Sequence, residues 1–237
     1  MLTELTQYYN FKKISAINFD CPHYRKVCSK GCNNFTCAQE AYVGSEYENG
    51  ELPRILFLSS DPGWPRPNPI GRTLSSLRNE LQGANIPSKG HWHETYEMAL
   101  MILSSFNKQF TIDSISPYFA HTNSAKCCQN KKGGKQADDI LFEYCKEFIP
   151  GELSILLPNI LITQGDKARQ AVNGAFKVIY EQEGLCDYKI IELTNEHRTL
   201  WFQSYHPSNF GRYWPQKKQC WSLFKNIAES FINGKLR

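Results

Sequence analysis

The chain alternates between short apolar runs of strand length and stretches whose apolar residues recur at helical spacing. Residues 53–60 are an apolar run that ends in small residues, and residues 72–82 have leucines at helical spacing. Between them, residues 61–71 contain four prolines, which exclude a helix there. This order predicts a βα unit whose loop follows the carboxyl end of the strand, where open α/β sheets place their ligands.

The same alternation continues to the end of the chain. It predicts an α/β fold of three layers, α/β/α, in which helices cover a mainly parallel central sheet. No linker divides the sequence, so we expect one domain over residues 1–237, made of an N-terminal helix with a cysteine-bearing loop (1–52) and an α/β core (53–237). Further strands are expected in residues 113–123, 157–165 and 200–209, and further helices in residues 94–106, 136–149, 166–172 and 218–232.

Polar side chains follow three of the predicted strands. Asp61 follows the first strand, Asn123 ends the second, and His206 follows the last. Parallel strands present their carboxyl ends at one edge, so we expect a carboxylate, an amide and an imidazole together on that rim. The histidines at 91 and 93 are a poor metal signature without further ligands, and we interpret them as structural.

The distribution of charged residues along the chain adds to this picture, whereas the total charge does not. The net charge of +4 is too small to indicate a nucleic-acid partner by itself. Residues 62–79, 126–135 and 206–218, however, carry ten Lys and Arg residues and no acid. If these segments meet, they form one positive face for a polyanion; the alternative is a set of solvated loops. No run of 18 apolar residues and no signal-peptide pattern is present, so we expect a cytosolic protein, associated with the nucleoid when it acts on DNA.

Nine cysteines are many for such a chain. Without an export signal, a thiolate-bound metal explains them better than a disulfide framework. A dispersed set of four suits an iron–sulfur cluster, whose four iron corners each take one thiolate. Cys186 and Cys220 stand alone in apolar or aromatic stretches, and we interpret them as structural. The other seven form two groups: Cys21, Cys28, Cys32 and Cys37, then Cys127, Cys128 and Cys145.

Four segments together resemble the uracil-DNA glycosylase superfamily, in particular its iron–sulfur branches. They are LFLSSDPG, TNSAKC followed by Cys145, LPNILITQGDKA, and SYHPS, in the order and spacing of that family. The resemblance covers about residues 20–232. It implies the α/β fold already predicted, with the active site at the carboxyl ends of the strands.

The resemblance also implies roles for the rim residues. Asp61 would position the attacking water and stabilise the oxocarbenium-like sugar, and Asn123 would hydrogen-bond the O4 and N3–H edge of uracil. His206 would donate toward O2 as the base departs as an anion. Gly63 and Trp64 would contact the base, with Trp64 in the place of the stacking aromatic residue that the family carries.

DNA contacts are expected next to these motifs. Ser208 and nearby backbone amides would hold phosphates, and Phe210 and Arg212 would form a finger that fills the gap left by the extruded nucleotide. The alternative for Phe210 is packing under the final helix. Lys131 and Lys132 lie in the Lys-rich loop 128–135, which would also face DNA.

The resemblance further implies a 4Fe–4S cluster with a structural role, since glycosylase chemistry transfers no electrons. The family pattern has two N-terminal cysteines, one four residues after the base-binding Asn, and one on the following helix. The predicted ligands are Cys32, Cys37, Cys127 and Cys145. The alternatives left open are Cys28 or Cys21 for Cys32, and Cys128 for Cys127.

We therefore expect a monomeric, monofunctional DNA glycosylase of base excision repair, acting on uracil or a related deaminated or modified base. No lysine on the motifs is placed to form a Schiff base. Ser59 and Ser60 depart from the family, whose first motif usually opens with Gly, often followed by an acidic residue. One alternative is a non-catalytic iron–sulfur protein of the same fold that binds nucleic acid. Another is a hydrolase or transferase acting on nucleotides.

Overall fold

A computed structural model describes residues 1–30, 32, 35–62, 71–82, 86–107, 109–131, 136–207 and 214–236, with side chains in the last range from residue 219 onward. Gly63, Trp64, Lys132, Ser208, Phe210 and Arg212, all predicted to contact the base or the DNA, lie outside the described residues. Among the helices that are described, none is long and apolar enough to cross a membrane.

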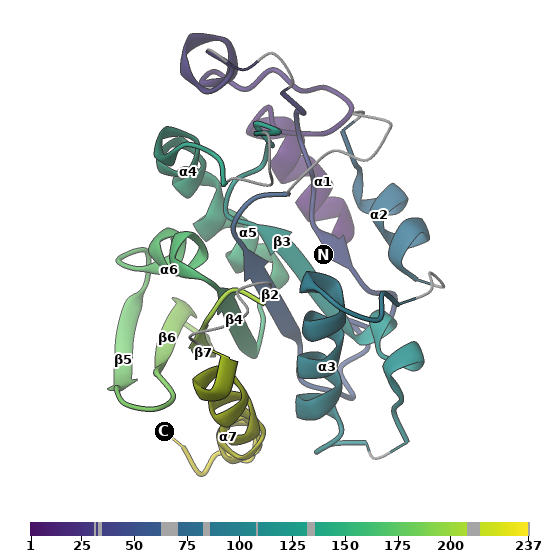
Figure 1. The fold of residues 1–237 in the computed structure, drawn as a ribbon, viewed down its shortest axis with the longest axis vertical. Helices are drawn as coiled ribbons and strands as arrows, with labels where there is room; N and C mark the ends of the chain where they lie inside the picture. Colours follow the sequence, from purple (N-terminus) through teal and green to yellow (C-terminus); the bar gives the residue numbers. More distant parts are fainter. Residues whose placement is uncertain are drawn as a thin grey trace.

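One mixed sheet forms the centre of the molecule (Figure 1). Its strands are β1 (Tyr42–Val43), β2 (Ile55–Ser59), β3 (Phe119–Asn123), β4 (Ile160–Gln164), β5 (Lys177–Gln182), β6 (Tyr188–Thr194) and β7 (His197–Ser204). They are arranged in the order β1-β3-β2-β4-β7-β6-β5. The four central strands run parallel, whereas β1, β6 and β5 are antiparallel to their neighbours. The α/β class with its mainly parallel centre is thus confirmed.

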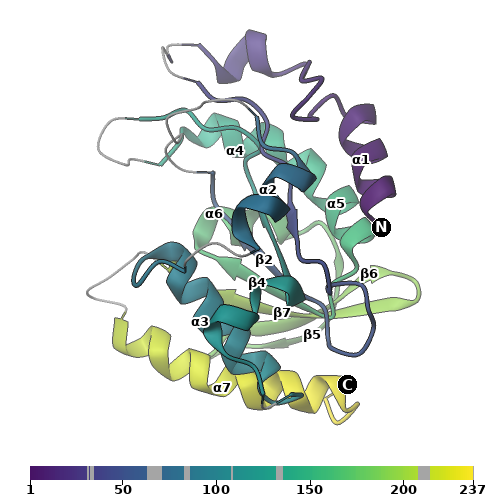
Figure 2. The ribbon, with the colours of Figure 1, turned by 90° about the vertical axis from the view of Figure 1, so that its right-hand side faces the viewer.

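Helices cover both faces of this sheet (Figure 2). The α-helices are α1 (Leu2–Phe11), α2 (Leu74–Leu81), α3 (His91–Leu103), α4 (Asp139–Cys145), α5 (Ile149–Leu156), α6 (Asp166–Val172) and α7 (Trp214–Ile232). Shorter turns are a π-helix at Tyr24–Cys28 and 3-10 helices at Ile112–Ser114, Ser116–Tyr118 and Lys146–Phe148.

The alternation of side chains along the strands divides the core in two. Leu56 and Leu58 of β2 pack on one face with residues of α1, α4, α5 and α6. Ile55 and Phe57 of the same strand pack on the other face with residues of α2, α3 and α7. Every position of β2 is buried, and its first four residues are apolar, so both faces of the strand are apolar, as expected for the middle of a parallel sheet.

The structure differs from the sequence expectation mainly at the edges of the sheet. The β5–β6 hairpin and the two-residue strand β1 were not predicted. β5 has four exposed and two half-buried positions, as an edge strand does, and its three apolar residues are consecutive, so they give no alternating pattern. The strand expected within 113–123 is confined to its last five residues, because Pro117 belongs to a 3-10 turn just before it.

Candidate active site

The ends of the parallel strands stand in register at one edge of the sheet. Ser59 of β2 is paired with Asn123 of β3, and Gln164 of β4 with Ser204 of β7. Backbone bonds continue this pairing beyond the strands, from the Ser124 N–H to the Ser59 carbonyl (2.8 Å) and from the Gly165 N–H to the Ser204 carbonyl (3.0 Å). The residues that follow the strands, including Asp61 and His206, therefore start from one rim.

Asp61 follows β2 by two residues and is partly buried. Burial raises the pKa of its carboxyl group, offset in part by a hydrogen bond with its own backbone N–H. A raised pKa means that the ionised form is poorly solvated where it stands. Such a carboxylate is a stronger base than an exposed one, which suits it to orient a water molecule.

Asn123 ends β3 and is 2 % exposed. Its side-chain nitrogen is buried and has no hydrogen-bond partner among the described residues. An amide nitrogen left in this state costs about 1–3 kcal/mol. A ligand with a carbonyl oxygen at this position would provide the missing acceptor.

His206 lies between the β4–α6 turn and the start of α3. Gly165, with a φ of +100°, is the tight point: a Cβ there would come within 3.2 Å of the His206 Cβ. On α3, the ring of His91 has its centroid 5.3 Å from that of His206, at 42°. His206 also lines a cleft of about 410 Å³ together with Gly165, Tyr205 and Cys220.

A network of buried polar side chains, which we call the Ser59 network, lies at the same edge and was missed from sequence. Its members are Ser59, His91, Thr95, His121 and Gln164. The Ser59 hydroxyl lies 2.6 Å from Gln164 Oε1, 2.8 Å from His121 Nε2 and 3.2 Å from His91 Nε2. Burial, together with the charges of Lys126 and Arg72, lowers the pKa of His121 to about 3, so His121 is neutral at physiological pH.

The predicted positive face needs a correction at three of its cations. Lys126 is 1 % exposed, and its ammonium group pairs with the buried Glu152 carboxylate at 2.5 Å. Arg72 pairs with Glu80 at 3.3 Å, and Arg78 donates to the Val43 carbonyl at 2.9 Å. These side chains hold the fold together instead of facing a polyanion. Lys131, predicted to contact DNA, is partly exposed and pairs with Asp138.

Lys126 belongs to a second buried group, the Glu152 network of Tyr9, Thr122, Lys126 and Glu152. The Lys126 ammonium donates to Thr122 Oγ1 at 2.8 Å, and the Thr122 hydroxyl donates to Glu152 Oε1 at 3.0 Å. Tyr9 also donates to Glu152 and accepts from the Ala41 N–H at 3.1 Å. Each of the four side chains has at least one polar partner, and the ion pair between Lys126 and Glu152 is buried.

Three of the four predicted cluster ligands lie together. The Cys127 thiol interacts electrostatically with those of Cys145, Cys37 and Cys21. Burial, followed by these neighbours, raises the pKa of Cys127 well above its usual value, and burial raises that of Cys145 to about 12. The backbone N–H of Lys126 also donates to Cys145 Sγ at 3.4 Å.

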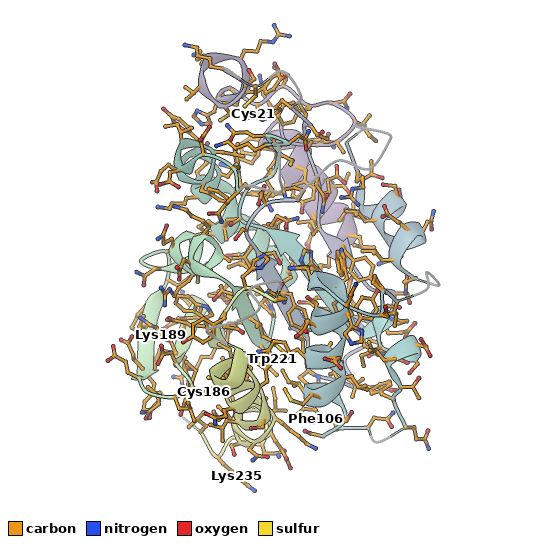
Figure 3. The ribbon with its side chains drawn as sticks, viewed as in Figure 1. Cys21, Phe106, Cys186, Lys189, Trp221 and Lys235 are labelled. Carbon is orange, nitrogen blue, oxygen red and sulfur yellow. The ribbon has the colours of Figure 1, made fainter. Side chains whose placement is uncertain are left out.

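The fourth predicted ligand, Cys32, interacts with Cys128, the neighbour of Cys127 in sequence. Two alternatives left open by the sequence, Cys21 and Cys28, line a small cavity with Cys127 and Cys145. Within the described ranges, no three His, Cys, Asp or Glu side chains are grouped so that they could hold a metal ion. Figure 3 shows Cys21 and Cys186 at opposite ends of the molecule. Cys186 and Cys220 are buried and contact each other, with Cys186 Sγ 3.8 Å from the Cys220 carbonyl, which agrees with a structural role.

An α/β protein with a carboxylate, an amide and an imidazole on the rim of its parallel strands belongs to the class that binds its ligand at the strand ends. Residues 48–225 match the uracil DNA glycosylase superfamily, and the chain belongs to that superfamily. Its members are generally glycosylase hydrolases, and the fold implies a DNA substrate. A search among curated proteins found no match. The matched range excludes the N-terminal group of four cysteines, so the resemblance to the iron–sulfur branches stays a prediction.

Proposed function

We propose that the protein is a monofunctional DNA glycosylase that hydrolyses the N-glycosidic bond between deoxyribose and uracil, or a related deaminated or modified base. The observation that carries this proposal is the Asn123 amide, a buried donor with no described partner on the rim that Asp61 and His206 also approach. A keto oxygen, such as O4 of uracil, would accept from it. An amino group at the same place would leave the donor unsatisfied.

The chemistry follows from the two other rim residues. As the C1′–N bond breaks, the base takes the bonding electrons and negative charge collects on its O2, where a hydrogen bond from His206 stabilises it. The sugar becomes oxocarbenium-like, and the Asp61 carboxylate stabilises that positive charge while it orients a water molecule toward C1′. Water adds its oxygen to C1′, and its proton passes to the carboxylate or to the departing base.

The nucleophile is water in this proposal, not an amine. Two lysines fall in the described parts of the family motifs. Lys126 is buried in its ion pair with Glu152, and Lys167 pairs with Asp139 at 2.8 Å. Both amines are therefore engaged in ion pairs and are not placed to attack C1′ and form a Schiff base.

We also propose a 4Fe–4S cluster held by Cys37, Cys127 and Cys145 with Cys21 as the fourth ligand. The donor set fits in type, because thiols are the ligands of such clusters and Cys21, Cys127 and Cys145 line one small cavity beside Cys37, although the described side chains are not grouped as they would be around a bound metal ion. Cys21 replaces Cys32 in the proposal because it interacts with the other three thiols. The cluster would tie the N-terminal segment to α4 and to the loop after β3, and it would take no part in hydrolysis.

Base release tests the proposed activity. Oligonucleotides that each bear one uracil, hypoxanthine, xanthine or mismatched thymine, in single and double strands, are incubated with the protein and then cleaved with alkali. We expect cleavage at uracil that is lost in Asp61→Asn and falls to a slow residual rate in His206→Ala. The matched controls are Asp113→Asn and His93→Ala, which remove an exposed Asp and a His that pairs with Glu97.

Two results would overturn the proposal. One is release that survives in both Asp61→Asn and His206→Ala. The other is no release from any substrate while DNA binding weakens steeply with added salt, which would favour the non-catalytic nucleic-acid-binding protein.

Anaerobic purification tests the cluster. We expect iron and sulfide, with an absorption band at about 400 nm that dithionite bleaches. Cys145→Ser and Cys21→Ser should lose the band, whereas Cys32→Ser and the remote Cys186→Ser should keep it. Colourless, iron-free protein would overturn the cluster, and loss of the band in Cys32→Ser but not in Cys21→Ser would restore the ligand set expected from sequence.

A further inference from the structure

The Ser59 hydroxyl is an unusual group to find at the end of β2. It is 2 % exposed, and its three polar neighbours come from three other elements: His121 from β3, Gln164 from β4 and His91 from the first turn of α3. A hydroxyl has one proton to donate and two lone pairs to accept with. Three neighbours therefore use its full capacity, which fixes the direction of each bond.

The far end of the network sets these directions. The Thr95 hydroxyl donates to the His91 backbone carbonyl at 2.9 Å, so it accepts from the Gln164 amide nitrogen, also at 2.9 Å. The Gln164 oxygen then faces Ser59 and can only accept, so the single proton of Ser59 goes to Gln164. Ser59 then has no proton left for the imidazoles, so in a hydrogen bond between Ser59 and His91 or His121 the imidazole Nε2 is the donor. The two Nε2 atoms also lie 3.4 Å from each other, so the two rings contact each other as well as Ser59.

His91 is thereby held in one tautomer and one orientation, and it is the neighbour of His206. Their ring centroids are 5.3 Å apart, while Gly165 approaches His206 elsewhere, at its Cβ and Cδ2. The glycine turn after β4 and the His91 ring are thus two of the contacts that place His206. The His91 ring is anchored by a hydrogen bond to Ser59, on the strand beside Asn123.

We propose that Ser59 and His91 are positioning residues for His206, and that they hold its imidazole where it can donate to the departing base. This inference rests on the proposed function. Ser59 orients His91 by accepting its Nε2 proton, and the His91 ring limits the rotation of the His206 ring. A hydrogen bond that stabilises developing charge requires placement within fractions of an ångström, and a misplacement of about 1 Å costs roughly 100-fold in rate.

A double-mutant cycle tests the inference. Single-turnover release of the base is measured for wild type, His91→Ala, His206→Ala and the double variant. We expect His91→Ala to slow the reaction by roughly 30- to 100-fold in the wild-type background, and by less than about 3-fold when His206 is already Ala. Effects that multiply in the double variant would overturn the inference, because His91 would then act independently of His206.

Two conservative variants separate the ring from its anchor. His91→Phe keeps a ring beside His206 but cannot donate to Ser59, and His91→Gln keeps a donor but lacks the ring. We expect Phe to retain more activity than Gln, and Ser59→Ala to add nothing to His91→Ala. His93→Ala, two residues along on the same helix, is the matched control and should release the base at the wild-type rate. Equal loss in His91→Gln and His93→Gln, with equal melting temperatures, would contradict the inference.

A measurement without substrate keeps this inference distinct from the proposed function. The imidazole carbon and nitrogen resonances of His206, assigned by their loss in His206→Ala, should shift in His91→Ala and in Ser59→Ala but not in His93→Ala. If the resonances shift while no base is released, the proposed function fails and the positioning contact stands. If base release is observed while the resonances and the cycle show no coupling, the positioning role fails alone.

Discussion

Two groups of buried polar side chains lie on opposite faces of β3: the Glu152 network on one face, and the Ser59 network together with Asn123 on the other. They differ in whether the described residues complete them. Thr122 faces α1 and α5, where the Glu152 network gives each of its members a partner. The residues on either side of it, His121 and Asn123, face the Ser59 network, and there the Asn123 nitrogen has no described partner. One strand thus carries a closed network on one face and an open one on the other. We infer that the closed network serves the fold and that the open one serves a ligand.

The largest effect is expected from breaking the closed network. Glu152→Ala leaves the buried Lys126 ammonium without its counter-charge, so it should lower the free energy of unfolding by about 3–5 kcal/mol. Glu143→Ala is the control, because Glu143 pairs with Lys146 on the surface and should cost at most about 1 kcal/mol. Urea denaturation measures both. Equal losses of unfolding free energy in the two variants would show that the buried ion pair contributes no more to stability than the surface pair.

The next prediction compares variants of two neighbouring residues of β3, Asn123 and Thr122. Asn123→Ala should slow base release by about 100-fold, because the base loses its donor. It should change the free energy of unfolding by less than about 1 kcal/mol, since its amide nitrogen has no bond to a described residue that could be lost. Thr122→Ala should release the base at a near-normal rate but lower the free energy of unfolding by about 1–3 kcal/mol. Similar profiles for the two variants would remove the distinction between open and closed networks.

His121 gives a smaller effect that depends on pH. Its pKa is about 3 in the folded protein against 6.5 in the unfolded chain, so only the unfolded chain takes up a proton between these values. Stability should therefore fall as the pH falls below 6.5, by about 2 kcal/mol at pH 5. When the pH is lowered to 5, His121→Gln, which cannot titrate, should lose about 2 kcal/mol less stability than wild type. His93→Gln should lose as much stability as wild type does. The same pH dependence in all three proteins would show that His121 is not the group responsible.

Asp61 should give the smallest effect, with the opposite sign. Its pKa is raised on folding, so the stability it contributes is present below its unfolded pKa and is lost as the pH rises through its folded pKa. Asp61→Asn should therefore be slightly more stable than wild type at pH 7, although it is inactive, and the difference should vanish at acid pH. Thermal unfolding at both values tests this, with Asp113→Asn unchanged. A loss of stability at pH 7 would mean that the carboxylate is paired.

The central part of this fold was predictable, and the reason is local. Residues 53–60 are apolar at consecutive positions and residues 61–71 are rich in proline, so the end of β2 is defined by neighbours in sequence. The same holds for Asn123 and for His206. Their placement on one rim follows from parallel pairing alone, whereas their roles remain predictions.

Residues whose character depends on distant partners were not predictable. Lys126 stands beside two cysteines in a Lys-rich segment and has the pattern of a surface cation, but Glu152 and Tyr9 enclose it from other helices. The residues around His91 in sequence do not have the spacing of metal ligands, and its place in the site comes from distant residues that the fold brings close, such as Ser59 and His206. The sequence signal that could have pointed to it was Ser59 itself, a hydroxyl where the family usually has Gly.

The order of the strands also limits the width of what can bind. Asn123 ends β3 and His206 follows β7, with β2 and β4 between them. Three strand spacings separate the two backbones, about 14 Å, and both side chains take up part of that distance. The remaining room is close to the breadth of one heterocyclic ring above the ends of β2 and β4. In the proposed reaction a stacked base pair would be too broad for this room, so the nucleotide would have to leave its partner before the two side chains could contact it from opposite sides.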